Sequence, residues 1–168
     1  GFAGIKTITT VADDTAREFR DDVNNVSSFT GVTAASRTNA LLKTLSADGA
    51  VQLEIGKQGT VDGTSPSANG LSSVTVAANI TTTDFTALRD AINNVSGETG
   101  VTASFFEGKK DELLLTDLDG DDIVLGNFDH DTASATITVQ AYDFFGTSIA
   151  SGSSAETLTQ GASDSGTI

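Results

Sequence analysis

A seven-residue stretch near the start of the chain recurs 69 positions later, and this repeat restricts the possible folds more than any other feature. Residues 21–27 read DDVNNVS, and residues 90–96 read DAINNVS. Three residues further along, TGVTA occurs at 30–34 and again at 99–103. A repeat of this length indicates one structural unit used twice. We therefore expect a scaffold built from two related units.

Each copy contains the pattern of an amphipathic helix. Thr15 and Glu18 have the spacing of a capping box, and Asp84 is a candidate N-cap in the second copy together with Thr83. Apolar residues then recur at spacings of three and four, which places them on one helical face. They are Ala16, Phe19, Val23 and Val26 in the first copy, and Phe85, Leu88, Ile92 and Val95 in the second.

The end of each helix carries the same two signals in both copies. Gly31 and Gly100 are placed to end the helices, because glycine accepts the left-handed conformation common at that position. The paired asparagines 24–25 and 93–94 lie near the last turn. We expect their side chains to bond to backbone groups at the helix exit or to the neighbouring strand.

Short runs rich in β-branched residues surround the two helices, and Asp-Gly pairs indicate hairpins. The predicted strands are 5–11, 32–36, 41–46 and 51–55, then 74–80, 101–106, 113–116 and 123–125, then 135–142, 147–150 and 156–160. The predicted fold class is α+β. It consists of two strand–helix–three-strand repeats, with helices packed on mainly antiparallel sheets, plus a C-terminal β segment. Residues 1–70 form the first unit and 71–168 the second, packed as one domain or two subdomains.

The charge of the chain excludes two classes of partner. The net charge is -14, from 23 acidic and 9 basic residues, so the surface repels nucleic acid and anionic membranes. There is no cysteine, which excludes disulfides, thiol nucleophiles and thiolate zinc sites. No apolar run reaches the ~20 residues that span a bilayer.

The repeated pattern resembles a known motif. A helix ending in roughly Ala-Ile-Asn-Asn, then Thr-Gly-Val-Thr-Ala, then an Asp-Gly hairpin is similar to the flagellin hook IN motif. Residues 90–103 match it closely, and residues 113–116 and 122–125 fit its strand pair. The first copy departs at Asp22-Val23 and at Phe29. The two copies cover somewhat more than half of the chain.

The resemblance implies a structural role outside the cell. It points to the surface-exposed outer variable region of a bacterial flagellin, in the flagellar filament that drives motility. Its partners would be other flagellin subunits, mainly through regions outside this sequence, and we expect the sequence to be a fragment of a longer chain. A flagellar cap or hook-associated protein is one alternative, and a carbohydrate- or calcium-binding adhesin module is another.

Reactive groups are few, and we predict no catalytic, cofactor-binding or metal-binding residues. His130, the sole histidine, lies between Asp129 and Asp131, and we expect it in an exposed loop. Asp117 to Asp122 is similar to the start of an EF-hand loop, but Phe128 occupies the position of the required glutamate. We interpret it as a solvated turn, with weak cation binding left open.

Modification sites are also candidates. Three N-glycosylation patterns begin at Asn25, Asn79 and Asn94, but two of them fall within predicted helices, which favours coincidence. Exposed serines and threonines at 63–67 and 151–154 are plausible O-glycan acceptors.

Overall fold

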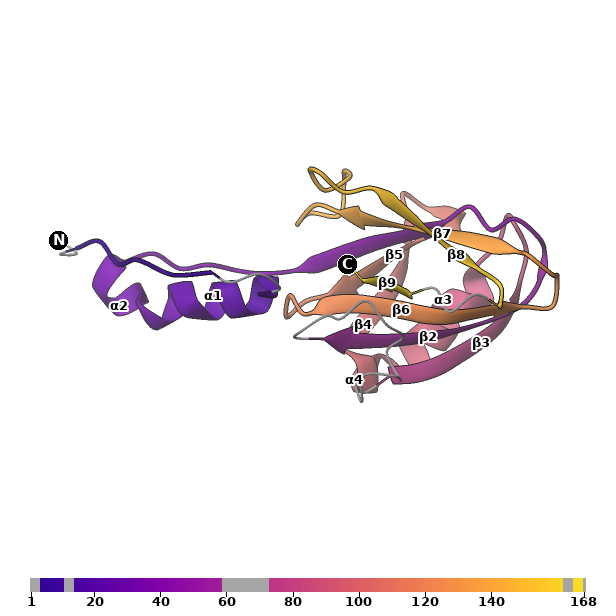
Figure 1. The fold of residues 1–168 in the computed structure, drawn as a ribbon, viewed down its shortest axis with the longest axis horizontal. Helices are drawn as coiled ribbons and strands as arrows, with labels where there is room; N and C mark the ends of the chain where they lie inside the picture. Colours follow the sequence, from indigo (N-terminus) through magenta and orange to yellow (C-terminus); the bar gives the residue numbers. More distant parts are fainter. Residues whose placement is uncertain (1–3, 11–13, 59–72, 162–164, 168) are drawn as a thin grey trace.

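A computed structural model of the chain describes residues 4–10, 14–58, 73–161 and 165–167. Two antiparallel sheets lie against each other, and a helical segment extends from one end of them (Figure 1). The chain is 19% helix and 44% strand, so the structure agrees with the α+β class. Every strand pairing among the described residues is antiparallel, as predicted.

The first sheet has five strands in the order β4-β5-β1-β7-β8. The strands are β1 (Thr38–Lys43), β4 (Val101–Phe106), β5 (Lys109–Asp117), β7 (Thr136–Tyr142) and β8 (Ala155–Thr159). The second sheet has the order β3-β2-β6-β9. Its strands are β2 (Gly49–Gln58), β3 (Ser73–Ile80), β6 (Asp122–His130) and β9 (Ser165–Thr167).

Strands from both halves of the chain share both sheets. In the first sheet, β1 lies between β5 and β7, and in the second, β2 lies between β3 and β6. The consecutive strands β1 and β2 therefore belong to different sheets, and so do β5 and β6. The two Asp-Gly turns connect the sheets, which corrects the prediction that they close hairpins. The division at residue 70 remains a prediction from the sequence repeat.

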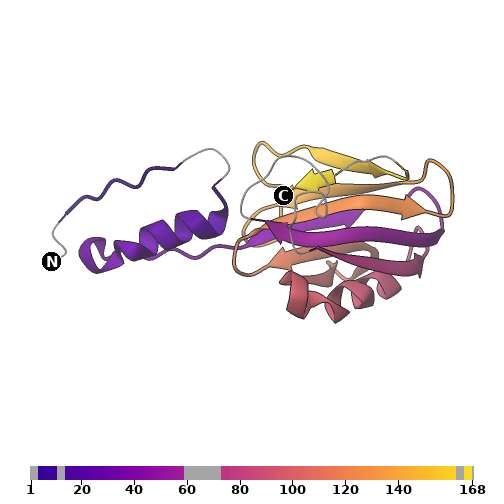
Figure 2. The same cartoon turned by 60° about the horizontal axis from the view of Figure 1, so that its bottom comes forward.

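The second helix closes one side of the sheets. Helix α3 (Thr86–Asn94) and the short α4 (Ser96–Thr99) pack against β3 and β4, the edge strands of the two sheets (Figure 2). Phe85, Leu88 and Ile92 have no solvent exposure, and they belong to one apolar core with residues of both sheets. The predicted burial of this stripe is thus confirmed for these three residues.

The starts of the two long helices are held by side chains. Thr15 and Glu18 form the predicted capping box at the start of the first helix, with both of its hydrogen bonds present. In the second copy, the Asp84 carboxylate accepts from the Thr86 N–H (2.8 Å). Hydrogen bonding by Thr86, through its side chain and its backbone, lowers the pKa of Asp84 below its usual value.

The first helical segment extends from one end of the two sheets and does not cover either of them. Helix α1 (Ala16–Asn25) is followed by the short α2 (Ser27–Thr30), and both extend away from the end of the sheets (Figures 1 and 2). None of the residues of α1 is buried. We call residues 4–10 and 14–37 the arm, and the remaining described residues the body.

The structure corrects the prediction for the first unit. Residues 5–10 and 32–36 belong to no strand, and α1 packs on no sheet. The reason is that β1 and β2, the strands that follow the first helix, pair with strands of the second unit instead of with these segments. Residues 147–150 also form no strand, apart from a single bridge between Tyr142 and Ile149. The strand predicted at 41–46 instead spans Thr38–Lys43, and the other predicted strands are present, several of them longer than expected.

Candidate functional site

The two helix exits have the same hydrogen bonds, residue for residue. The Asn24 side chain donates to the Ala34 carbonyl (3.1 Å) and accepts from the Ala34 N–H (2.9 Å). The Asn93 side chain makes the same two bonds to Ala103, at 2.9 and 2.8 Å. The expected bonding of these asparagines to the following segment is therefore confirmed for the first member of each pair. An amide satisfies both backbone groups of one residue because it carries a donor and an acceptor.

The rest of each exit is repeated as well. Ser27 and Ser96 donate to the backbone carbonyls of Asn24 and Asn93, at 2.6 and 2.8 Å. Gly31 and Gly100 adopt φ of 72° and 75°, the left-handed conformation that ends a helix at little cost only in glycine. The local sequence thus encodes the turn from helix to extended chain in both copies.

The acidic turn between β5 and β6 is ordered by its first carboxylate. One Asp117 oxygen accepts hydrogen bonds from the backbone N–H groups of Asp119, Gly120 and Asp121, at 2.8, 2.9 and 3.2 Å. Asp117 and Asp121 are both buried. The prediction of a fully solvated turn is therefore wrong for these two carboxylates, because the arm lies over the turn.

Two cationic side chains meet the buried Asp121 carboxylate. Arg17, from the arm, and Lys57, from β2, each lie 3.0 Å from the same Asp121 oxygen. The hydrogen bond to Asp121 raises the pKa of Lys57 above its usual value, and the charges of Asp117 and Asp119 act in the same direction. Burying a carboxylate is costly unless it is paired, so these two cations account for its position.

Further contacts fasten the arm to the same turn. The Arg17 N–H donates to the Gly120 carbonyl (3.0 Å). Arg20 and Ser36 both donate to the Asp119 carbonyl, at 2.9 and 2.6 Å. The turn therefore acts as an anchor for the arm.

The same three acidic residues have the spacing of a cation site. Asp117, Asp119 and Asp121 each offer an oxygen within 4.8 Å of the others. All three carboxylates are already engaged. Asp117 accepts from backbone N–H groups, Asp121 pairs with Arg17 and Lys57, and Asp119 lies 3.8 Å from the Lys57 Nζ. Among the described residues, the geometry is that of an ion-paired turn.

His130 does not lie in an exposed loop, which corrects the prediction. It is the last residue of β6, and its ring is fully buried. Nδ1 accepts from the Thr132 N–H (2.8 Å), and Nε2 donates to the Ala47 carbonyl (3.1 Å). Both ring nitrogens therefore serve the backbone, as expected of a structural histidine.

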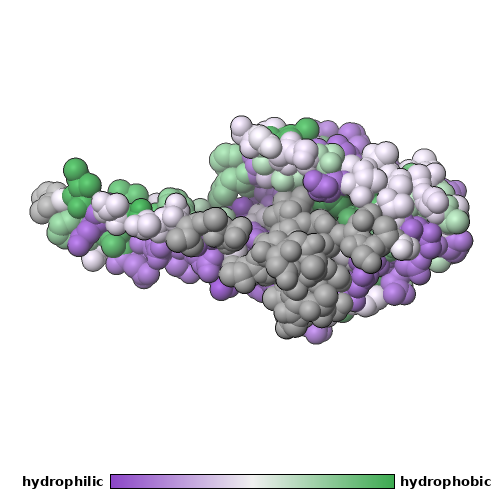
Figure 3. All heavy atoms as spheres, in the orientation of Figure 1, coloured by the Kyte–Doolittle hydropathy of each residue, from purple (hydrophilic) through white to green (hydrophobic). Residues whose placement is uncertain are grey.

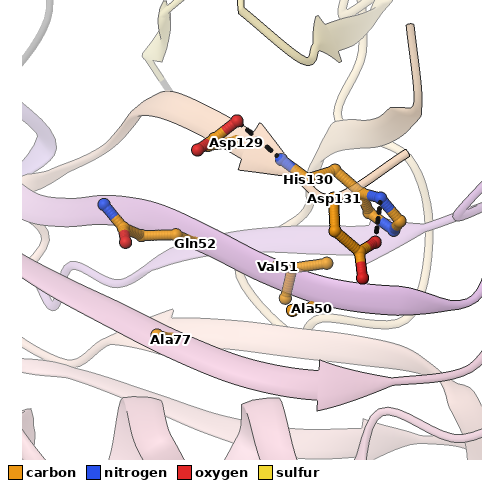
Figure 4. A pocket seen from close by; sticks show the side chains of 7 residues that line it. All are labelled: Ala50, Val51, Gln52, Ala77, Asp129, His130 and Asp131. Carbon is orange, nitrogen blue, oxygen red and sulfur yellow. Dashed lines mark hydrogen bonds and ion pairs between the residues drawn. The ribbon is translucent and has the colours of Figure 1, made fainter. Parts of the chain in front are cut away.

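A shallow hollow of about 240 Å³ lies beside this histidine, lined by Ala50, Val51, Gln52, Ala77, Asp129, His130 and Asp131 (Figure 4). The Asp129 and His130 side chains point to different sides of β6, as successive strand residues do. The Asp129 carboxylate accepts from the His130 backbone N–H (3.0 Å) and not from the imidazole ring. The Asp131 carboxylate approaches Nδ1 (3.0 Å), the nitrogen that already accepts from Thr132. This arrangement offers no free imidazole nitrogen for proton transfer.

The candidate modification sites lie in different settings. Asn25 and Asn94 are the last residues of α1 and α3, and Asn79 lies within β3. The expectation that two of the three lie in helices is confirmed. Among the candidate O-glycan acceptors, Ser151 and Ser154 are exposed, whereas residues 63–67 lie outside the described residues.

The arm displays an apolar face that includes Phe19, a residue of the stripe predicted to pack in the core. Its large apolar side chains remain exposed: Ile5 by 96%, Phe19 by 47%, Phe29 by 42% and Val32 by 57%. Apolar residues are visible along one edge of the arm, and hydrophilic residues along the other (Figure 3). The sequence pattern identified the stripe but carried no information on what covers it.

None of the helices in the described ranges has the length and apolar character that a membrane crossing requires.

Comparisons with known proteins give partial structural similarities. No family model and no curated protein sequence matches the chain. A similar solved structure is the crystal structure of the flagellar cap protein FliD D1-D2-D3 domains from Escherichia coli, with 20% identity and a TM-score of 0.33. The similarity covers 81% of this chain and 38% of that chain. A similarity at this level assigns neither a fold nor an activity.

Proposed function

We propose that the chain is a structural, surface-exposed domain of a bacterial flagellar protein, specifically the outer variable region of a flagellin. The observation that carries the proposal is the duplicated helix exit. The residues that resemble the hook IN motif are the residues that form it, with Asn24 and Asn93 each binding the backbone ten residues further along. A motif that bonds its own backbone supports a role in architecture.

The hydrogen bonds and ion pairs of His130 and Asp121 support a role without catalysis. Both nitrogens of His130 are bonded to the backbone, and Asp121 is paired with two cations. A general base needs a free lone pair within reach of a substrate proton. In this proposal the acidic surface keeps neighbouring filaments apart by repulsion, which high salt would screen and so allow filaments to bundle.

Immunogold electron microscopy on flagellated cells that produce the protein tests the proposal. Antibodies raised against the purified chain should label flagellar filaments along their whole length, and excess purified chain should abolish the label. Label confined to the filament tip or to the hook junction would support the alternative of a cap or hook-associated protein. Label absent from flagella altogether would overturn both.

The adhesin alternative makes a different prediction at the acidic turn. A calcium ion at Asp117, Asp119 and Asp121 would have to displace Arg17 and Lys57. Calorimetry with calcium should therefore give a flat trace. A saturable transition at millimolar calcium or tighter would favour the adhesin module instead.

A further inference from the structure

The apolar face of the arm has a buried counterpart within the same chain. Phe19 and Val23 match Leu88 and Ile92 of the second unit by the 69-residue offset. In the second unit these positions have no solvent exposure, because α3 packs on the two sheets. In the arm, Phe19 is 47% exposed, and no residue of α1 is buried. The same amphipathic unit is thus covered once and uncovered once.

We propose that the uncovered face binds a second copy of this chain, arm against arm. The arm face consists of the exposed Ile5, Phe19, Phe29 and Val32 and the half-buried Val23. Removing apolar surface of this kind from water is favourable, and contiguous exposed apolar patches on a protein mark interaction sites. This proposal does not depend on the flagellar assignment, since it concerns only the surface of the chain itself.

The charge distribution selects the arm of another copy as the occupant. Residues 1–37 carry 4 basic and 5 acidic side chains, whereas residues 38–168 carry 5 basic and 18 acidic side chains. The net charge is therefore -1 for the first segment and -13 for the rest. Contact between two bodies would bring two strongly negative surfaces together. Contact between an arm and a body would place the arm of one copy against the strongly negative surface of the other. Arm-to-arm contact is the only one of the three that joins two nearly neutral surfaces.

Two-fold symmetry and charge together set the orientation. A pair of identical chains with one shared patch is related by a two-fold axis, which lies either along the arms or across them. An axis along the arms would set the two negative bodies side by side, so the charge favours an axis across the arms, with the two arms antiparallel. The arm extends from one end of the sheets with α2 at its far end (Figure 1). Val23 lies near the middle of the arm's helical segment, between Phe19 and Phe29. Antiparallel pairing places Val23 near the axis, brings Phe19 of each copy toward Phe29 of the other, and keeps most of each body away from the other.

The size of the arm face predicts a weak pair. Four partly exposed apolar side chains and their polar neighbours bury about 1,200 Å² in total when two arms meet, the lower limit of specific interfaces. The expected dissociation constant is roughly 10 to 100 µM. Sedimentation velocity should show a mass that rises from monomer toward dimer across this range of concentration.

Paired variants separate the arm from the rest of the surface. The double variant Phe19→Ser/Phe29→Ser should raise the dissociation constant at least tenfold. The control is Phe145→Ser, in the loop between β7 and β8, where the side chain is 75% exposed and lies outside the arm. It should change the constant by less than about twofold. Thermal unfolding of each variant checks that the body still folds, because none of these side chains is buried.

Cross-linking tests which side of α1 faces the second copy. Because the chain has no cysteine, a single introduced thiol is its only one. Val23→Cys should give a covalent dimer with a short bis-maleimide, whereas Asn25→Cys, on the opposite side of α1, should not. A protein that stays monomeric to about 1 mM would overturn the proposal. So would a dimer that Phe145→Ser weakens and the arm variant does not, or one that cross-links through Asn25→Cys alone.

Discussion

The two copies of the repeat share their local structure and differ in their surroundings. Each helix ends with the same asparagine bond, the same serine bond and a glycine in the left-handed conformation. Yet α3 lies on the core and α1 lies in the arm. The comparison shows that the local sequence decides how a helix ends, and that the partner strands decide whether its apolar face is buried.

The difference arises from which strands pair with the strands that follow each helix. In the second unit, β4 follows the helix directly and pairs with β5, so α3 stays beside its own strands. In the first unit, β1 and β2 each lie between two other strands, all four of them from the second unit. The first helix is therefore separated from the strands that its sequence pattern assigns to it.

The largest expected difference between the copies is at matched stripe positions. Leu88→Ala should lower the free energy of unfolding by about 2 to 5 kcal/mol, because it leaves a cavity in the core. Phe19→Ala removes more atoms but from a half-exposed site, so it should cost less than about 1 kcal/mol. Chemical denaturation of both variants measures the difference. Equal losses would show that the arm packs on the body in solution.

The asparagines give the next contrast. Asn93→Ala leaves both backbone groups of Ala103 without this partner and should destabilise the protein by about 1 to 3 kcal/mol. Asn24→Ala should leave global unfolding nearly unchanged and should speed amide exchange at Ala34. Denaturation together with hydrogen exchange by NMR checks both statements. Slow exchange at Ala34 in Asn24→Ala would contradict the second.

A glycine in the acidic turn tests how the arm is held. Gly120 has φ of +83°, and a Cβ there would lie 2.5 Å from the Ser36 Cβ. Gly120→Ala should therefore push the arm away from the turn and cost about 1 to 2 kcal/mol. Gly152→Ala is a matched control, because Gly152 has φ of +82° and open space around it. Only Gly120→Ala should speed amide exchange at Arg17.

The smallest effect concerns the corresponding turn of the first unit. Asp48 accepts from the Thr82 N–H (2.7 Å), and this bond lowers the pKa of Asp48 below its usual value of 3.8. The folded state thus favours the ionised carboxylate. Its stabilising contribution is present above pH 3.8 and is lost as the pH falls through the lower folded-state pKa. Asp48→Asn should therefore be less stable than the original at pH 7, and the two should converge in acid, as thermal unfolding at several pH values will show.

The sequence predicted the second unit well because its signals are local. The range of β4 is as predicted, and Phe85, Leu88 and Ile92 of the stripe are buried. The capping box of Thr15 and Glu18 in the first unit is a local signal too, and it is present. The pairing of β1 with β5 and β7 could not be predicted, because it depends on contacts about 70 to 100 residues apart. Pattern and propensity carry no information on such partners.

The wrong prediction for His130 has a local explanation. The sequence predicts that β6 ends at Leu125, because Gly126 and Asn127 interrupt its run of apolar residues. A β-bulge occurs there, with Asn127 at φ of 50°, and the strand continues to His130. Beyond the bulge Phe128 and His130 are two residues apart and both buried, a signal that a search allowing for one extra residue would have found.

The two Asp-Gly turns have a consequence for how such a protein changes over generations. Asp48 in the turn of the first copy binds Thr82, just before the helix of the second. Gly120 and Asp121 in the turn of the second copy bind Arg17, at the start of the helix of the first. The turn of each copy binds the start of the other copy's helix. Deleting or replacing one copy alone would therefore remove contacts that stabilise the other. The pair, and not the single repeat, is the piece that evolution can transplant.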